Sequence, residues 1–374
     1  MKVALVHDWL NGMRGGEKVL EVVCDIFPNA DLYTLFYEPD FVSDKIRRME
    51  PRPSVLQRFP FARRCYRHLL PLYPWAVERF DMSSYDAVIS LSHCAAKGVR
   101  VAERQIHVCY CFTPMRYIWD QYGLYFEGPN RRRLQSLVMR LCRERLRSWD
   151  VSTAQRVSRF IAASMAVTHR IARYYNREAA VVHPPVDTDR FRPLDVKQND
   201  YFLIVAAIVP YKRIDLAVET FSRMGRRLLV AGDGPERSRL ERRAGRSVRF
   251  LGWVSDEQLV ELYNGCRALI FPGEEDFGIT ALEAQACGRP VIALRRGGAL
   301  ETVVEGRTGL FFSEQTSEAL SQAVESFDSL SFDRTVIRAH AEKFGRDRFR
   351  RELEKTILGI LSEHGLEATS PTAL

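Results

Sequence analysis

Short apolar runs alternate with helical segments along most of this chain, and no other feature constrains its fold as strongly. In the first half, the apolar runs occupy 3–7, 31–35, 87–91, 106–110, 159–163 and 180–183. A second series occupies 201–207, 227–231, 248–251, 268–271 and 291–294. Runs of this length with helices between them are typical of parallel strands whose two faces are both covered. The pattern predicts two doubly wound α/β domains.

The break between the two series is rich in proline and polar residues, from Pro184 and Pro185 through Pro193. Such a segment is typical of a linker. We therefore expect an N-terminal domain over 1–193 and a C-terminal domain over 194–345. A helix with one apolar face is expected over 346–364, and 365–374 has the composition of a loose tail.

Two carboxylates, Glu275 and Glu283, flank the expected start of a helix at Gly278. A rise of about 1.5 Å per residue places Glu283 roughly 8 Å along that helix. The spacing suits a ligand with two hydroxylated ends, and free N–H groups at the helix start favour a phosphate between them. These N–H groups belong to Phe277, Gly278, Ile279 and Thr280. The alternative interpretation is an ordinary loop before a helix, with two solvated acids.

The residues around this pair resemble the signature region of retaining glycosyltransferase family 4. Bacterial mannosyltransferases that build O-antigen and exopolysaccharide are especially similar. The resemblance continues in order through 3–10, 107–111, 113–120, 182–187, 209–215, 231–236, 275–292 and 297–301. It implies the GT-B fold: two Rossmann-like doubly wound parallel-sheet domains facing a cleft, with a C-terminal helix that crosses back to the N-terminal domain.

The resemblance also implies an activity. A retaining glycosyltransferase would move a hexose from a nucleotide-sugar donor to a lipid-linked saccharide acceptor in bacterial surface polysaccharide synthesis. Mannose from GDP-mannose is the expected donor, because the motifs are most similar to those of mannosyltransferases. Glu275 would position the sugar and Glu283 the ribose, with no metal ion or cofactor. A UDP-hexose or UDP-N-acetylhexosamine donor is one alternative, and a catalytically silent regulator that binds a sugar nucleotide is another.

Two cations, Lys212 and Arg213, follow an expected strand and a Pro-Tyr turn. This position lies at the carboxyl end of the sheet, where ligands of open α/β sheets bind. Solvated surface charges are the alternative interpretation. The resemblance assigns the donor diphosphate to Lys212. Ala207 departs from the pattern, because many members carry an arginine there. Either Arg213 or a cation of the first domain compensates, or the leaving group is stabilised less.

Four residues of the first half are further candidates. His93 follows an expected strand, and the resemblance implies that it contacts the donor sugar and contributes to catalysis; a satisfied structural histidine is the alternative. Gly15 and Gly16 open the first helix, where backbone N–H groups could meet a pyrophosphate or a sugar. A tight structural turn explains these glycines equally well. Asp8, at the end of the first strand, is a lesser candidate for contact with the acceptor.

Recognition of the nucleotide base is expected in the loop 252–256. Its Trp253 could stack on the base or fill the core. A run of Asp187, Thr188 and Asp189 suggests a metal site, because paired aspartates bind Mg²⁺ in other transferases. We reject that interpretation because the run falls in the linker, where Asp or Thr caps a turn.

The net charge of +8 and the isoelectric point near 9.1 indicate an acidic partner. Cations and apolar side chains share two segments, 47–75 and 131–147. We interpret both segments as amphipathic surfaces that bind an anionic membrane; outer helices packed on a sheet are the alternative. No motif that reads nucleic acid is present, so we expect no nucleic-acid partner.

The chain has 374 residues, of which 46% are hydrophobic, and this is enough for two cores. No apolar stretch is long enough to span a membrane. The N-terminus begins with a strand pattern rather than a signal peptide. The eight cysteines are scattered, several of them within apolar runs, which is typical of reduced thiols. We therefore expect a cytoplasmic protein at the inner face of the cytoplasmic membrane.

Overall fold

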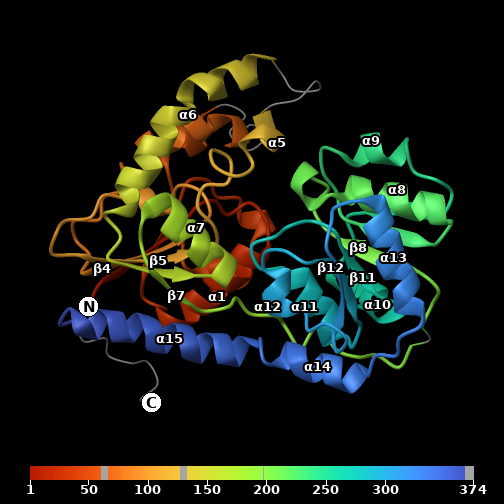
Figure 1. Cartoon of the computed structure of the whole chain (residues 1–374). Coiled ribbons are helices and arrows are strands. Elements are labelled where there is room, and N and C mark those ends of the chain that lie inside the picture. Colours follow the sequence, from red (N-terminus) through yellow and green to blue (C-terminus); the bar gives the residue numbers. More distant parts are fainter. Residues whose placement is uncertain (60–65, 127–132, 197, 367–374) are drawn as a thin grey trace. The chain divides into compact units, whose positions relative to one another are not determined.

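The computed structural model describes residues 1–59, 66–126, 133–196 and 198–366. The chain divides into two compact units, both visible in Figure 1. Unit 1 comprises Met1–Pro184 and Phe349–Leu374, and unit 2 comprises Pro185–Arg348. Each unit is an α/β domain around its own parallel sheet. Most of the expected tail, 367–374, lies outside the described residues.

The boundary between the units differs from the expected division into 1–193 and 194–345, because it falls after Pro184. The proline-rich segment is not a free linker but the first part of unit 2. Val186 pairs with Gly345, and Phe191 packs in the core of unit 2 with its ring centroid 5.7 Å from that of Tyr263. The contact of Val186 with Gly345 joins both ends of unit 2, and that of Phe191 joins the segment to its core.

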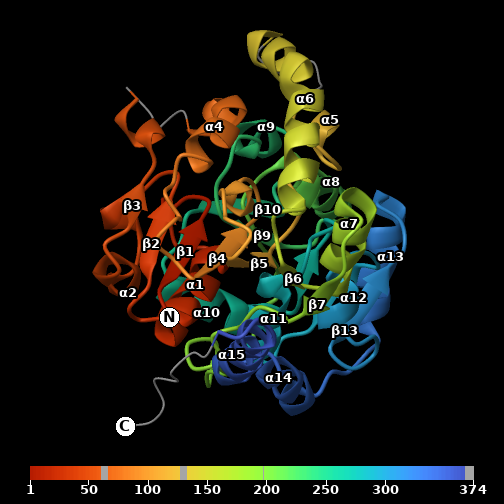
Figure 2. The ribbon, with the colours of Figure 1, turned by 90° about the vertical axis from the view of Figure 1, so that its left-hand side faces the viewer.

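Unit 1 contains a seven-stranded sheet in the order β3-β2-β1-β4-β5-β6-β7, with all neighbours parallel (Figure 2). Its strands are β1 (Val3–His7), β2 (Asp31–Thr34), β3 (Arg52–Pro53), β4 (Ala87–Ser92), β5 (Ile106–Cys111), β6 (Arg159–Ala162) and β7 (Ala179–Val181). Its helices are α1 (Gly15–Ile26), α2 (Asp44–Arg48), α4 (Tyr73–Val77), α5 (Tyr122–Phe126), α6 (Arg133–Ala154), α7 (Met165–Tyr175) and most of α15 (Arg346–Glu363). The central strands β1, β4 and β5 are buried along their whole length, as expected for a sheet covered on both faces.

The C-terminal helix α15 belongs to unit 1, as the sequence predicted. Its apolar face, which includes Phe349, Leu353 and Ile357, joins the core that α1 forms on one face of the sheet. Side chains of α4 and α6 contribute to a second core, which covers the other face. Burial of one apolar stripe on the sheet holds α15 in place.

Unit 2 contains a six-stranded parallel sheet in the order β10-β9-β8-β11-β12-β13. Its strands are β8 (Phe202–Val205), β9 (Leu228–Ala231), β10 (Val248–Gly252), β11 (Leu269–Phe271), β12 (Val291–Leu294) and β13 (Gly309–Phe312). Its helices are α8 (Ile214–Met224), α9 (Arg237–Glu241), α10 (Asp256–Gly265), α11 (Ile279–Ala286), α12 (Ala299–Thr302), α13 (Ser317–Asp328) and α14 (Arg334–Glu342). This is the strand order of doubly wound nucleotide-binding domains. The fold class predicted from the sequence is confirmed in both units.

Two strands were not predicted, β3 and β13. The first is only two residues long and contains Pro53, which argues against a strand except at an edge. The second begins with Gly309, where a Cβ atom would lie 2.0 Å from the carbonyl oxygen of Val291. Close approach of the β12 backbone therefore requires glycine, although glycine weakens the strand pattern in the sequence.

The two basic segments are built differently from one another. Segment 47–75 is not one amphipathic surface, because Leu70 and Tyr73 are buried in the core of unit 1. Residues 60–65 of this segment, and Arg131 and Arg132 of the second, lie outside the described residues. The second segment forms most of α6, where Leu141 is 74% exposed. In the described parts of the chain, no helix is both long and apolar enough to cross a bilayer.

Candidate functional site

Each sheet reverses its strand order between two neighbouring strands, β1 and β4 in unit 1 and β8 and β11 in unit 2. Loops that follow such a pair of strands diverge, and ligands of open α/β sheets bind between them. A candidate residue follows each of these strands in the sequence: Asp8 after β1, His93 after β4, Lys212 after β8 and Glu275 after β11. Each unit therefore has a polar pair at its switch point.

Lys212 and Glu275 form the pair of unit 2. Nζ of Lys212 lies 2.8 Å from Oε1 of Glu275, although the residues are 63 positions apart in sequence. The side chains are 12% and 19% exposed, so a ligand can reach a pair that is largely shielded from water. Shielding strengthens the field of both charges. The ammonium can bind a phosphate oxygen, and the carboxylate can accept hydrogen bonds from hydroxyl groups.

The loop that carries Glu275 is fixed by close backbone packing. A Cβ atom on Gly273 would lie 2.7 Å from Cα of Lys212, and one on Gly298 would lie 2.2 Å from Cα of Phe277. The N–H of Gly298 donates to the carbonyl of Glu275 at 2.9 Å. Larger residues at these two glycines would push the loop away from its neighbours, so the glycines hold Glu275 at Lys212.

The start of α11 offers backbone donors next to this loop. Gly278 precedes the helix with φ of +94°, in the left-handed region that favours glycine. The N–H groups of Ile279 and Thr280 open the helix and have no partner within it. Phe277 is buried in the core of unit 2 and anchors the helix start. Free N–H groups and the helix dipole together suit an anion at this position.

Glu283 lies within α11 and is only 4% exposed. Its Oε2 accepts a hydrogen bond from the hydroxyl of Tyr263 on α10 at 2.9 Å. Burial and the charge of Glu283 raise the pKa of Tyr263, so the phenol stays protonated and keeps donating. Sequence reasoning missed Tyr263, because nothing distinguishes it from the other apolar positions of its helix.

Arg213 supports the site rather than standing free in it. It precedes α8 with φ of +51°, and its Nε lies 3.2 Å from Oδ1 of Asp215. Its Nη1 donates to Oε1 of Gln315 at 3.2 Å, and Nε2 of Gln315 donates to the carbonyl of Pro272 at 3.1 Å. The guanidinium thereby ties the turn after β8 to the loop after β11. Ala207 is exposed and contributes no charge there.

Two other expectations for unit 2 concern loops. Trp253 is 81% exposed, which excludes the core-filling interpretation and leaves an indole that a base could stack on. Asp187 accepts the N–H of Arg190 at 3.1 Å, as a turn cap does, and its Oδ2 lies within 4 Å of a nitrogen of Arg190 and of Arg346. Its carboxylate is therefore engaged by arginines.

Asp8 and His93 form the pair of unit 1. Asp8 is completely buried, which contradicts the expectation that its side chain contacts the acceptor. Its carboxylate accepts the N–H groups of four successive residues, 93–96, at 2.6–2.9 Å. Oδ2 also lies 3.0 Å from Nδ1 of His93. Burial acts to raise the pKa of Asp8, but the charge and hydrogen bonds of His93 outweigh it and lower the pKa to about 2.

The glycines at the start of α1 give no support to a phosphate site. Neither Gly15 nor Gly16 has a positive φ, and a Cβ atom on Gly16 would meet Phe112 at an ordinary 3.5 Å. Glu17 lies in the first turn, where its Oε2 accepts the N–H of Arg14 at 2.9 Å. The negative charge of that carboxylate would repel an anionic ligand at this helix start. The role assigned to Gly15 and Gly16 stays a prediction.

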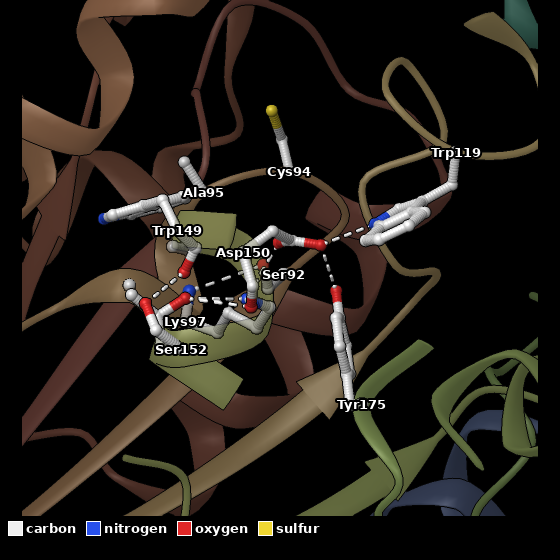
Figure 3. A network of polar contacts seen from close by, with 12 residues as sticks. Ser92, Cys94, Ala95, Lys97, Trp119, Trp149, Asp150, Ser152 and Tyr175 are labelled. Carbon is white, nitrogen blue, oxygen red and sulfur yellow. Dashed lines mark hydrogen bonds and ion pairs between the residues drawn. The ribbon is translucent and has the colours of Figure 1, made fainter. Parts of the chain in front are cut away.

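A buried ion pair holds the far end of the loop that carries His93 (Figure 3). Nζ of Lys97 lies 2.8 Å from Oδ1 of Asp150 on α6, and both side chains are almost completely buried. Oδ2 of Asp150 accepts hydrogen bonds from Nε1 of Trp119 at 2.8 Å and from the hydroxyl of Tyr175 at 2.9 Å. Asp150 thus joins segments that follow β4 and β5 to α6 and α7. Sequence reasoning found neither partner.

The family comparison decides how the pair in unit 2 is interpreted. Residues 185–344 match the family model described as Glycosyl transferases group 1. Unit 2 is therefore similar to the domain that this model describes. The matched range covers nearly all of unit 2 and includes Lys212, Glu275 and Glu283.

Curated relatives share part of the chain. This chain is 30% identical to a D-inositol 3-phosphate glycosyltransferase of Streptomyces avermitilis over 227 aligned residues. The alignment covers 50% of this chain and 49% of that protein. A D-inositol 3-phosphate glycosyltransferase 2 of Catenulispora acidiphila is 34% identical over 184 residues, 40% of this chain and 43% of that protein. The chain spans about half the length of the curated relatives it matches.

Solved structures resemble the chain over almost its whole length. The lipopolysaccharide outer core galactosyltransferase WaaB has a TM-score of 0.65 at 17% identity, covering 96% of this chain and all of that one. Anabaena Alr3699/HepE, solved in complex with UDP and glucose, has a TM-score of 0.64 at 15% identity, covering 96% and 99%. These likenesses confirm the GT-B fold class.

Proposed function

We propose that this protein is a retaining glycosyltransferase that transfers a hexose from a nucleotide sugar to a lipid-linked saccharide in the synthesis of a bacterial surface polysaccharide. The observation that carries the proposal is the Lys212–Glu275 pair at the switch point of a glycosyl transferases group 1 domain. A cation beside an acid, next to free helix N–H groups, matches a donor with a diphosphate between two hydroxylated ends.

Different residues of unit 2 bind different parts of the donor. Lys212 and the N–H groups at the start of α11 bind the diphosphate and stabilise its charge as it leaves. Glu275 accepts hydrogen bonds from hydroxyls of the sugar, and Glu283 does so from the ribose. Trp253 offers a face to the base. The bond between the anomeric carbon and the phosphate oxygen breaks while the acceptor hydroxyl oxygen bonds to the anomeric carbon on the same face, and the hydroxyl proton passes to the departing phosphate oxygen. We assign no covalent nucleophile and no metal ion.

Mannose from GDP-mannose is our first choice of donor, on the resemblance to mannosyltransferases. A UDP-hexose is a serious second choice, because Alr3699/HepE was solved with UDP and glucose and WaaB is named a galactosyltransferase. UDP-N-acetylhexosamine belongs to the same class. A catalytically silent sugar-nucleotide regulator is the remaining alternative, which Ala207 suggests and the intact Lys212–Glu275 pair opposes.

Thermal unfolding with GDP, UDP, GDP-mannose and UDP-glucose tests the proposal. We expect one nucleotide series to raise the melting temperature by several degrees, because a ligand that binds only the folded form stabilises it by about 2.7 kcal/mol at a hundredfold excess over Kd. Glu283→Ala should abolish most of that rise, whereas Glu325→Ala, an exposed acid on α13, should keep it. No rise with any of the four compounds would falsify the donor assignment.

We further propose that the protein is cytoplasmic and binds the inner face of the cytoplasmic membrane, where it meets its lipid-linked acceptor. Support comes from α6, where Leu137, Val138 and Leu141 are exposed together with Arg140 and Arg145. Apolar side chains beside arginines suit an anionic lipid surface. Segment 47–75 also supports membrane binding, because its Phe59, Leu72 and Trp75 are exposed.

Co-sedimentation with liposomes tests the membrane proposal. We expect binding to vesicles that contain phosphatidylglycerol and little binding to pure phosphatidylcholine. The double variant Val138→Ser and Leu141→Ser should weaken binding by roughly tenfold or more, because each side chain loses its transfer into lipid. Leu330→Ser, a change at an exposed apolar residue of unit 2, is the matched control. Equal sedimentation with both lipids would remove the proposal.

A further inference from the structure

The carboxylate of Asp8, just after β1 in unit 1, is contacted by several hydrogen-bond donors at once. Asp8 receives four backbone N–H groups from 93–96 and also faces Nδ1 of His93 at 3.0 Å. The two residues are 85 positions apart, so the contact exists only in the folded unit. We propose that Asp8 is a positioning residue that fixes the ring of His93 with its Nδ1 protonated, which leaves Nε2 as the nitrogen that meets the donor sugar. This inference rests on the proposed function.

The protonation state of the ring follows from what Asp8 can do. Its carboxylate is ionised at neutral pH, since its pKa is about 2, and an ionised carboxylate only accepts hydrogen bonds. Nδ1 of His93 must therefore carry the proton in this contact. Among the described residues, Nε2 makes no hydrogen bond, and the side chain is 23% exposed. Whenever the ring is uncharged, Nε2 is therefore the nitrogen without a proton, and it presents an acceptor lone pair.

The orientation of the ring is fixed as firmly as its tautomer. The indole of Trp9 lies edge to face against the imidazole, with centroids 4.4 Å apart and an interplanar angle of 87°. The ring of Phe112 also lies near the imidazole, with centroids 6.4 Å apart. Because the same carboxylate binds both the ring and the backbone of its loop, ring and loop cannot rotate independently. Beyond the loop, Lys97 is held by Asp150.

This arrangement defines what Nε2 can recognise. A lone pair held in one direction accepts a hydrogen bond from a hydroxyl group, and the hydroxyls of a hexose are the groups that the proposed donor would bring. The opposite tautomer would present an N–H there and would require an acceptor on the ligand. Through His93, Asp8 therefore determines that a ligand hydroxyl donates to Nε2 rather than accepts from it, without touching the ligand itself.

The test is the tautomer of His93, measured by ¹⁵N NMR on the full chain without any ligand. The spectra are recorded at a pH high enough to deprotonate the imidazolium, and in the wild type we expect the shifts of a ring that keeps its proton at Nδ1. Asp8→Asn should move them toward the Nε2-protonated form or toward an exchanging mixture, because the amide has one oxygen and no charge. A wild-type ring protonated at Nε2 overturns the inference, and so does a folded Asp8→Asn protein with an unchanged tautomer.

A second measurement compares the changes in kcat and in KM for the hydrolysis of GDP-mannose or UDP-glucose. Asp8→Asn should lower kcat by about tenfold or more and change KM less, because a misoriented ring affects the reacting geometry more than the binding of the nucleotide. Ser92→Ala removes a hydroxyl that accepts the N–H of Lys97 from the same loop and should leave both constants near wild type. Equal losses in the two variants would overturn a role through His93.

The two measurements separate this inference from the proposed function. If no nucleotide or nucleotide sugar raises the melting temperature, the proposed function fails, whereas the NMR result still decides the role of Asp8. If Asp8→Asn does not fold, the wild-type tautomer remains decisive, and His93→Gln provides the kinetic comparison. Glutamine should lose turnover without loss of the folded state, because the backbone N–H groups of 93–96 still bind Asp8.

Discussion

Lys212→Ala should lower turnover by at least about tenfold, which corresponds to about 1.4 kcal/mol of lost transition-state stabilisation. The ammonium is the charge best placed to neutralise the leaving diphosphate, and hydrogen bonds to charged groups contribute about 1.5–3 kcal/mol each. A loss of a hundredfold would match the removal of one donor from a preorganised anion site. Initial rates of nucleoside diphosphate release measure the effect.

Two controls make this prediction specific. Lys343→Ala removes an exposed lysine at the end of α14 and should keep the wild-type rate. Glu275→Gln keeps a hydrogen-bond partner for Lys212 but removes the acid, so a decrease comparable to that of Lys212→Ala indicates that both members of the 2.8 Å pair act on the donor. Wild-type turnover in Lys212→Ala would contradict the assignment of the diphosphate site.

Lys97→Met should lower the free energy of unfolding of unit 1 by about 3–5 kcal/mol, because it leaves the buried carboxylate of Asp150 without its cation. Adding Asp150→Leu should recover part of that loss, since a buried ion pair can be replaced by apolar residues at little cost. Urea denaturation followed by tryptophan fluorescence reports mainly on unit 1, which holds four of the five tryptophans.

An exposed ion pair provides the control for this prediction. Nη1 of Arg223 lies 2.8 Å from Oε1 of Glu318, and the two side chains are 53% and 69% exposed. Arg223→Met should leave the urea midpoint close to that of the wild type, because water screens surface pairs. A Lys97→Met protein as stable as the wild type would show that Asp150 is satisfied by Trp119 and Tyr175 alone.

Local patterns predicted much of this fold. The runs 3–7 and 291–294 are strands with the expected limits, and the C-terminal helix, expected over 346–364, extends from Arg346 to Glu363. Strand and helix periodicities depend on residues close in sequence, which is why they can be read there. The proline-rich segment was misjudged because its contacts, such as that of Val186 with Gly345, bridge the whole of unit 2.

The aromatic residues of 47–75 also show that local sequence predicts some features, whereas contacts between distant residues decide others. Trp75 and Phe59 are exposed as an interfacial surface requires, but Tyr73 is buried. Composition cannot distinguish the two cases, because an aromatic next to a cation serves equally well in a core and at a surface. Only the packing of the chain against Trp9 and Phe36 places Tyr73 inside.

By itself, the sequence determined two doubly wound domains and the start of α11 at Gly278. It also placed Lys212 and Glu275 after strands and Glu283 within a helix. The tertiary structure decided which side chains meet: Asp8 with His93, Lys97 with Asp150, and Glu283 with Tyr263. Backbone geometry repeats over a few residues and is therefore encoded locally. Charges and hydrogen-bonding groups acquire their function from partners distant in sequence, which parallel strands bring to one edge of a sheet.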